Sequence, residues 1–152
     1  MTKKKINLNN NSLIEQFGMK PYKLRVKEKY MSKRQLNHFK KILRSWKQQL
    51  EHEAEKTVNH MQKDSNSLAD PNDRATQESE FGLELRTRDR ERKLIRKIQS
   101  SLIKIDDGTF GYCEETGEEI GLPRLEARPV ASLTLEAQER REITEKQYTD
   151  SR

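Results

Sequence analysis

The chain has 152 residues, which is enough for one domain or for one small domain with an appendage. Charged residues make up 37% of it and hydrophobic residues 31%, which excludes a thick globular core along the whole length but suits the narrow apolar seam of packed helices. The formal net charge of +6 lies in residues 1–30, with eight basic and two acidic residues, and the rest of the chain is balanced.

Residues 1–30 are predicted to form a basic, partly disordered leader that joins a small folded base. The leader begins with a stretch rich in Lys and Asn. Three apolar residues in it are candidates for a short docking turn: Leu13, Ile14 and Phe17. Further along, Tyr22 and Tyr30 lie in a basic connector and are expected to pack on the base.

A long helix is predicted to begin after Ser32, because Ser32 and Gln35 have the spacing of a capping box. Apolar residues then recur every three or four positions, as on one face of a helix: Leu36, Phe39, Leu43, Trp46, Leu50, Ala54, Val58 and Met61. At 1.5 Å per residue, about 35 residues span roughly 50 Å, which is longer than a compact domain of this size uses. The helix is expected to end near residues 65–68.

A second long helix is predicted to start at Pro71. Asp70 followed by Pro71 is typical of a helix N-cap and first helical residue, and the pattern runs toward Asp106. Two long helices joined by so short a break must fold back antiparallel. We therefore expect a helical hairpin over residues 31–106 with its tip at 66–75.

The second helix carries an apolar face with one interruption. The expected face consists of Ala75, Phe81, Leu85, Ile95, Ile98, Leu102 and Ile105. In residues 86–93, seven of eight residues are charged. This stretch is either a solvated face held by pairs such as Asp89 with Arg92 or Lys93, or an arginine-rich docking surface for an acidic partner. Gly82 marks either close approach of another surface or local softening, at a cost of up to about 1 kcal/mol against Ala.

The pattern changes in residues 107–137, where glycines, aromatics and turn residues predict a small module of short strands or turns. Its core is expected to consist of Ile120, Leu122, Leu125, Ala127, Val130 and Leu133. Thr134 is expected to cap a charged C-terminal helix that ends near Tyr148, and residues 138–152 are assigned to this helical segment. The predicted fold is thus mainly α: a long antiparallel coiled-coil hairpin projecting from a small α/β globular base with a C-terminal helix.

A resemblance to a known family rests on five stretches: Asp70–Ala75, Glu84–Ile95, Phe110–Cys113, Glu119–Gly121 and Arg124–Pro129. These resemble the DksA/TraR family of bacterial RNA polymerase-binding transcription factors, in register over about residues 20–148. The resemblance implies a coiled-coil hairpin on a base that contains a four-cysteine zinc finger and a C-terminal helix.

The sequence departs from the family at the finger. The four cysteine positions of the family fall on Cys113, Thr116, Thr134 and Ala137. Structural zinc needs about four Cys or His ligands, which hydroxyls and a methyl group do not replace. The histidines all belong to the first predicted helix: His38, His52 and His60. We therefore expect a degenerate, zinc-finger-like module without metal, as in cysteine-poor, zinc-independent members, and no stably bound cofactor.

The resemblance implies regulation of transcription by direct contact with RNA polymerase. The hairpin is expected to enter the secondary channel, where an acidic tip near the active centre modulates initiation at ribosomal RNA and stringent-response promoters. The implied tip residues are Asp70, Asp73 and Ala75. Contacts with the largest subunit, at the rim of the channel, are implied for Arg86, Thr87 and Arg90.

The resemblance also implies an effector, (p)ppGpp, which is shared with RNA polymerase. Its positions fall on Leu94, Lys97 and Arg128, with Arg124 nearby. Cationic side chains suit such an anion. Gln138 stands where the family has a further lysine, so a weaker response to (p)ppGpp is expected.

Other classes of function fit the sequence less well. A nonspecific nucleic-acid-binding protein would use the basic leader, but no recognition-helix or aromatic sheet motif is present, and sequence-specific DNA binding is not expected. A coiled-coil scaffold would use the same seam as a dimer, whereas we expect a monomer. The sequence contains no phosphate-loop motif, and no histidine lies close to Cys113 in sequence, so an enzyme is not expected. No run resembles a signal peptide or membrane span, so a soluble, cytoplasmic protein is expected, and one cysteine excludes an internal disulfide.

Overall fold

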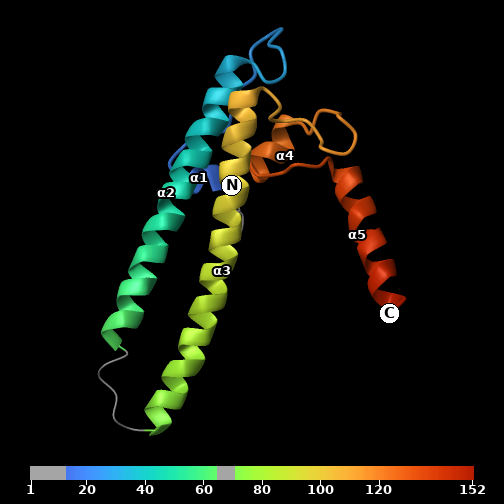
Figure 1. Cartoon of the computed structure of the whole chain (residues 1–152). Coiled ribbons are helices and arrows are strands. Elements are labelled where there is room, and N and C mark those ends of the chain that lie inside the picture. Colours follow the sequence, from blue (N-terminus) through green and yellow to red (C-terminus); the bar gives the residue numbers. More distant parts are fainter. Residues whose placement is uncertain (1–12, 65–70) are drawn as a thin grey trace, which may run out of the picture. The chain divides into compact units, whose positions relative to one another are not determined.

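A computed structural model describes residues 13–64 and 71–152. These residues are mainly helical (Figure 1), and the helices are α1 (Leu13–Gln16), α2 (Lys33–Asp64), α3 (Pro71–Asp107), α4 (Leu122–Ala127) and α5 (Leu135–Asp150). The chain divides into two compact units: Met1–Ile42 with Ser101–Arg152, and Leu43–Ser100. None of the described helices is both long and apolar enough to cross a membrane.

The first unit is built around apolar side chains from every element in it. Its buried members include Ile14, Phe39, Ile42, Ile105, Phe110, Leu125, Leu133 and Ala137. The rings of Phe39 and Phe110 lie 5.5 Å apart between centroids, and Lys40 Nζ of α2 lies 3.1 Å from Asp106 Oδ1 of α3. The predicted core residue Ala127 is exposed instead, because it lies at the end of the short α4.

The N-terminal segment packs on this unit, as predicted. Ile14 of α1 is only 1% exposed, and α1 contacts α4. The Tyr22 amide donates to Glu126 Oε1 at 2.6 Å. The Tyr30 hydroxyl donates to the Gly111 carbonyl at 2.7 Å and accepts from the Gly121 amide at 3.0 Å.

The predicted cap of α2 is confirmed with one difference. The Gln35 amide donates to Ser32 Oγ at 3.4 Å, while Gln35 Oε1 accepts from the Met31 amide at 2.8 Å rather than from the amide of Ser32. Both side chains thus satisfy backbone donors that a helix start leaves without partners.

The short strands expected in residues 107–137 are not present in the part of the chain that the structure describes. A single antiparallel bridge pairs Tyr112 with Glu119. Gly111 and Gly117 have φ of 90° and 73°, a left-handed conformation that turns the backbone on either side of Cys113. The ladder cannot extend past these turns, so this module consists of turns around buried side chains.

In the second unit, α2 and α3 lie side by side (Figure 1), and His60 Nδ1 of α2 is 4.0 Å from Glu84 Oε1 of α3. Leu43, Leu50 and Ile98 are buried. Leu85 was predicted on this face but is 52% exposed. Five half-buried positions of α3 in this unit follow a spacing of three and four: Phe81, Glu84, Arg88, Glu91 and Ile95. Gln77, Gly82 and Leu94 are also half-buried.

This spacing is the heptad pattern of packed helices. The face of α3 that packs on α2 therefore includes polar residues such as Glu84 and Arg88, and Leu85 lies outside it. Glu84 Oε2 and Arg88 Nε are buried without a hydrogen-bond partner in the described structure. The charged interruption noted in the sequence is therefore partly inside the helix pair and not wholly on its surface.

Candidate functional site

The first turn of α3 presents an acidic side chain to solvent. Pro71 is the first helical residue, as predicted, and Asp73 lies exposed in the first turn. A carboxylate at this position complements the positive end of the helix dipole. Ala75 is also exposed, and Asp70 lies outside the described residues.

Further along α3, the charged stretch separates into three kinds of side chain. Arg88 and Glu91 are half-buried in the seam. Asp89 Oδ2 lies 3.1 Å from Lys93 Nζ, which supports the solvated-face interpretation for that pair. Arg86 and Arg90 are exposed, and neither forms an ion pair with any described residue. The positive charges of Arg86 and Arg90 are therefore not neutralised by any described carboxylate and are accessible to another molecule.

Two other residues of the same helix, Thr87 and Gly82, differ in their surroundings. The Thr87 hydroxyl is exposed and donates to the Leu83 carbonyl at 3.1 Å. A Cβ added at Gly82 would meet no described atom within 4 Å. Close packing inside this unit therefore does not require the glycine, and approach by another molecule or softening of the helix both stay open.

The predicted effector residues fall in both units. Leu94 is half-exposed and Lys97 exposed in the second unit, and Arg128 is exposed in the first. Arg128 lines a pocket of about 610 Å³ together with Arg124 and three glutamates: Glu118, Glu119 and Glu136. Arg124 Nε donates to the Leu133 carbonyl at 3.0 Å, so its guanidinium has a structural role. Arg128 is the less constrained of the two cations.

Three of the four finger positions meet in the interior of the first unit. Cys113, Thr134 and Ala137 are at most 6% exposed. Thr134 Oγ1 lies 3.9 Å from Cys113 Sγ and accepts from the Ala137 amide at 3.3 Å, which makes Thr134 the N-cap of α5. The sequence predicted this cap but not the bond to the sulfur.

The electrostatics of Cys113 follow from the same arrangement. Burial raises the pKa of the thiol, but hydrogen bonds from the Thr116 hydroxyl and from the backbone amides of Thr134, Thr116 and Glu115 outweigh it. Together they lower the pKa to about 6. Hydrogen-bond donors of Glu115, Thr116 and Thr134 thus surround the sulfur of Cys113.

These residues do not fit the zinc that the family's finger implies. Zinc requires about four nitrogen, sulfur or carboxylate ligands, and only Cys113 offers one. The described residues contain no group of three or more His, Cys, Asp or Glu side chains able to hold a metal ion. Hydrogen bonds and packing take the place of ligation here.

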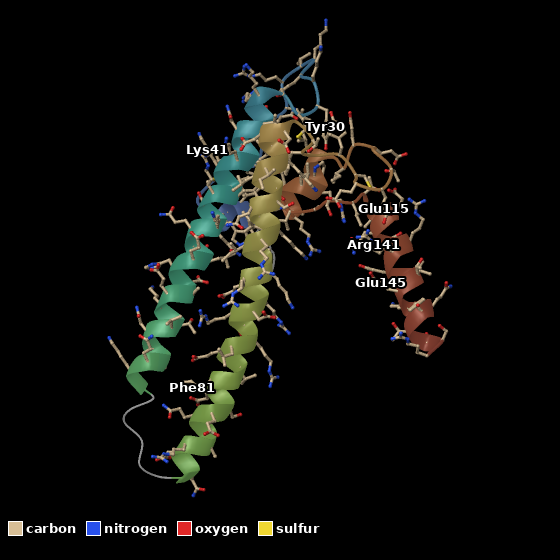
Figure 2. The ribbon with its side chains drawn as sticks, in the orientation of Figure 1. Tyr30, Lys41, Phe81, Glu115, Arg141 and Glu145 are labelled. Carbon is tan, nitrogen blue, oxygen red and sulfur yellow. The ribbon has the colours of Figure 1, made fainter. Side chains whose placement is uncertain are left out.

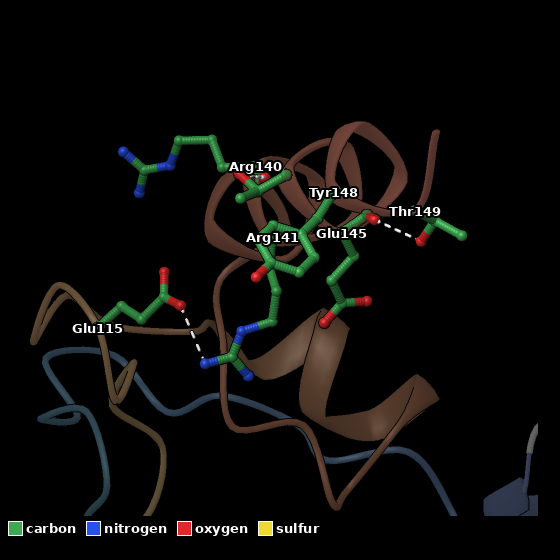
Figure 3. Close-up of a pocket in the computed structure, with 7 residues that line it drawn as sticks. Glu115, Arg140, Arg141, Glu145, Tyr148 and Thr149 are labelled. Carbon is green, nitrogen blue, oxygen red and sulfur yellow. Dashed lines mark hydrogen bonds and ion pairs between the residues drawn. The ribbon is translucent and has the colours of Figure 1, made fainter. Parts of the chain in front are cut away.

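An ion pair adds a second connection between the loop and α5. Arg141 Nη2 lies 3.1 Å from Glu115 Oε1 at the edge of a pocket of about 790 Å³ (Figure 3). The charges that line it are mixed, with Arg141 and Glu145 on the same helix (Figure 2). This mixture of signs favours no particular ligand.

Two family profiles match the chain. The N-terminal domain of DnaK suppressor protein DksA matches residues 35–105, and the prokaryotic DksA/TraR C4-type zinc finger matches residues 108–142. The RNA polymerase-binding transcription factor DksA of Haemophilus influenzae is 53% identical over 136 residues, which cover 90% of this chain and 94% of the relative. The protein of the same name from Escherichia coli K12 is 52% identical, with 90% of each chain covered. The solved structure of transcription factor DksA2 from Pseudomonas aeruginosa superposes with a TM-score of 0.71 at 38% identity, covering 77% of this chain and 90% of that one.

Proposed function

The chain belongs to the DksA family of transcription factors, and from that premise we propose that it regulates transcription by binding RNA polymerase directly. The observation that carries the proposal is the identity of about half the residues over 90% of the chain to relatives named for this binding. It acts as a regulator and not as an enzyme, in the cytoplasm where the polymerase works.

The proposed binding element is a coiled-coil hairpin formed by α2 and α3. The helices have 32 and 37 residues, which at 1.5 Å per residue correspond to roughly 50 Å each. That length suits insertion into the secondary channel of the polymerase. Asp73, together with Asp70, then acts near the active centre to modulate initiation at ribosomal RNA and stringent-response promoters.

The proposed contact surface on the outside of the hairpin consists of Arg86, Thr87 and Arg90. Support comes from the two arginines, which are exposed and lack ion pairs among the described residues. A bound acidic surface at the channel rim of the largest subunit supplies the missing partners. The protein works as a monomer, since one hairpin occupies one channel.

The proposed effector is (p)ppGpp, held jointly with the polymerase by Leu94, Lys97 and Arg128. The support is the exposure of both cations, Lys97 and Arg128. Gln138 offers no charge where the family has lysine, so we propose a weaker effect of (p)ppGpp. No other cofactor is required.

The experiment that tests the proposal is a pull-down of purified core RNA polymerase by the tagged full chain, with and without DNA. Retention in both conditions, together with a monomeric mass of the free chain, supports direct binding. Retention only when DNA is present points to nucleic-acid bridging. A dimeric mass without polymerase binding points to a coiled-coil scaffold.

A further inference from the structure

Positive charge is concentrated in one part of the first unit. Residues 20–41 contain nine basic residues and one acidic residue, whereas residues 42–152 contain nineteen basic and twenty-three acidic residues. The excess therefore extends past the leader into the start of α2. None of the contacts proposed above for polymerase or (p)ppGpp uses this segment.

The fold gathers part of this charge around one pocket of about 670 Å³. One wall is the segment with Lys20 and Lys23, and the other is a face of α2 with Arg34 and Lys41. We call these four residues the basic patch. Arg34, Asn37, His38 and Lys41 share a helical face because they recur every three or four positions. Figure 2 shows Lys41 on the side of α2 away from α3.

The cations of the basic patch are available to a ligand. In the described structure none of the four forms an ion pair, whereas the neighbouring Lys40 is paired with Asp106. No acidic residue lines the pocket. Two carboxylates act on residues that line the pocket. Glu28 accepts from the Tyr22 and Ser32 hydroxyls and interacts electrostatically with Arg34. Glu126 accepts from the Tyr22 amide and lies 3.6 Å from His38 Nε2, so Lys20, Lys23 and Lys41 are the cations without a described acidic partner.

The walls of the pocket are held in place by Tyr22. Its backbone is fixed to Glu126, its hydroxyl to Glu28, and the guanidinium carbon of Arg34 lies 5.2 Å from its ring centroid. His38 also contacts the ring, with centroids 5.2 Å apart. Burial lowers the pKa of His38, so the charge of the patch comes from lysine and arginine and does not vary near neutral pH.

We propose that the basic patch binds the phosphate backbone of a nucleic acid without reading its bases. Arg34 and Lys41 are seven residues apart, so they are separated by roughly 10 Å along α2, which suits a row of phosphates better than one small anion. Arg34 and His38 already contact the Tyr22 ring, and the pocket offers no other aromatic ring on which a base could stack. Binding is therefore sequence-independent and strongly dependent on salt.

The test uses the full chain and a fluorescently labelled DNA duplex of about 20 base pairs, with affinity measured by anisotropy between about 50 and 200 mM salt. The variant K23Q/K41Q removes one cation from each wall. The control variant R140Q/K146Q removes the same charge from exposed sites on α5 of the same unit. Both variants keep Lys3, Lys4 and Lys5 and lose the same total charge, so a difference between them reports on the patch.

We expect K23Q/K41Q to lower the affinity at least about tenfold at the lowest salt and to reduce the slope of log affinity against log salt by about 1.8, which corresponds to two phosphate contacts. The control should stay within about twofold of the parent. Equal loss in both variants would overturn the proposal, since net charge alone would then explain binding.

Two other outcomes would also overturn it. Binding of inorganic tripolyphosphate that is lost in K23Q/K41Q, with duplex binding unchanged, would make the pocket a small-anion site. Loss of core polymerase binding in K23Q/K41Q, with duplex binding unchanged, would make the patch a protein-docking surface. A circular dichroism spectrum matching the parent verifies that each variant is folded.

Discussion

The hydroxyl of Thr134 lies 3.9 Å from the sulfur of Cys113 and caps α5 through the amide of Ala137. One buried side chain thereby connects the loop at Cys113 to the first turn of the C-terminal helix. In a zinc finger, this connection is made by metal ligation from both segments. Here it depends on hydrogen bonds and close packing.

The first prediction is that the purified chain contains no stoichiometric zinc. Because only one thiol is present among the finger positions, a chelator has no structural metal to remove. Elemental analysis should find far less than one zinc per chain, and the melting temperature should be the same with and without a strong chelator. One zinc per chain, lost together with the folded state, would show that this account of the finger is wrong.

The second prediction concerns Thr134→Val, which keeps the shape of the side chain and removes the hydroxyl. We expect a loss of about 1–2 kcal/mol in the free energy of unfolding, because the Ala137 amide loses its capping acceptor in a buried site. Urea denaturation measures it. The control is Thr144→Val on the exposed part of α5, which should change stability by less than about 0.5 kcal/mol. An equal loss of unfolding free energy in Thr134→Val and Thr144→Val would show that the Thr134 hydroxyl has no special role in stability.

The third prediction concerns the pH dependence that comes from Cys113. The thiol has a pKa of about 6 in the folded chain against an ordinary value of 9.0, so folding favours the thiolate. Its contribution to stability is therefore absent below about pH 6, rises between about pH 6 and 9, and is complete above that range. The difference in unfolding free energy between the parent and Cys113→Ala should grow over this interval. Thiolate absorbance that develops only near pH 9 would contradict the lowered pKa.

The fourth prediction concerns the polar seam between α2 and α3. Replacing Glu84 and Arg88 together by leucine removes two buried polar atoms without hydrogen-bond partners, Glu84 Oε2 and Arg88 Nε. Leaving such a group unsatisfied costs about 1–3 kcal/mol, which exceeds the contribution of an exposed ion pair such as that of Glu84 with His60. The double variant should unfold at a higher temperature by several degrees, as followed by helical circular dichroism. Arg86→Leu, at an exposed position, should leave the melting temperature unchanged. A lower melting temperature for the double variant would mean that the pair stabilises the seam.

Features that depend on local chemistry could be predicted from the sequence. The starts of α2, α3 and α5 each follow from a nearby residue: a capping pair at Ser32 and Gln35, a proline at Pro71, and a hydroxyl at Thr134. Each signal lies within a few residues of the backbone that it organises. The loss of zinc ligands was equally visible, because it depends only on residue type.

Features that depend on packing between distant segments were harder to predict. Leu85 was placed on the helix face by a local pattern, but the heptad spacing of the seam selects Glu84 instead. Ile42 is fully buried but was missed, because the pattern of steps of three and four had already selected the adjacent Leu43. The basic patch was missed because Lys20 and Lys23 meet α2 only after the N-terminal segment folds back onto it.

The most direct test of the proposed function is transcription in vitro from a ribosomal RNA promoter with saturating Asp73→Asn variant. This change removes the exposed charge and keeps the volume, so the unfolding free energy should change by less than about 1 kcal/mol, and polymerase binding, measured by competition, should persist. Arg128→Ala is the matched control, which should keep the basal effect and lose the part added by (p)ppGpp. We predict that Asp73→Asn loses most of the effect on initiation while it remains bound. Full activity of the bound variant would show that Asp73 only supports the helix start and that the tip mechanism is wrong.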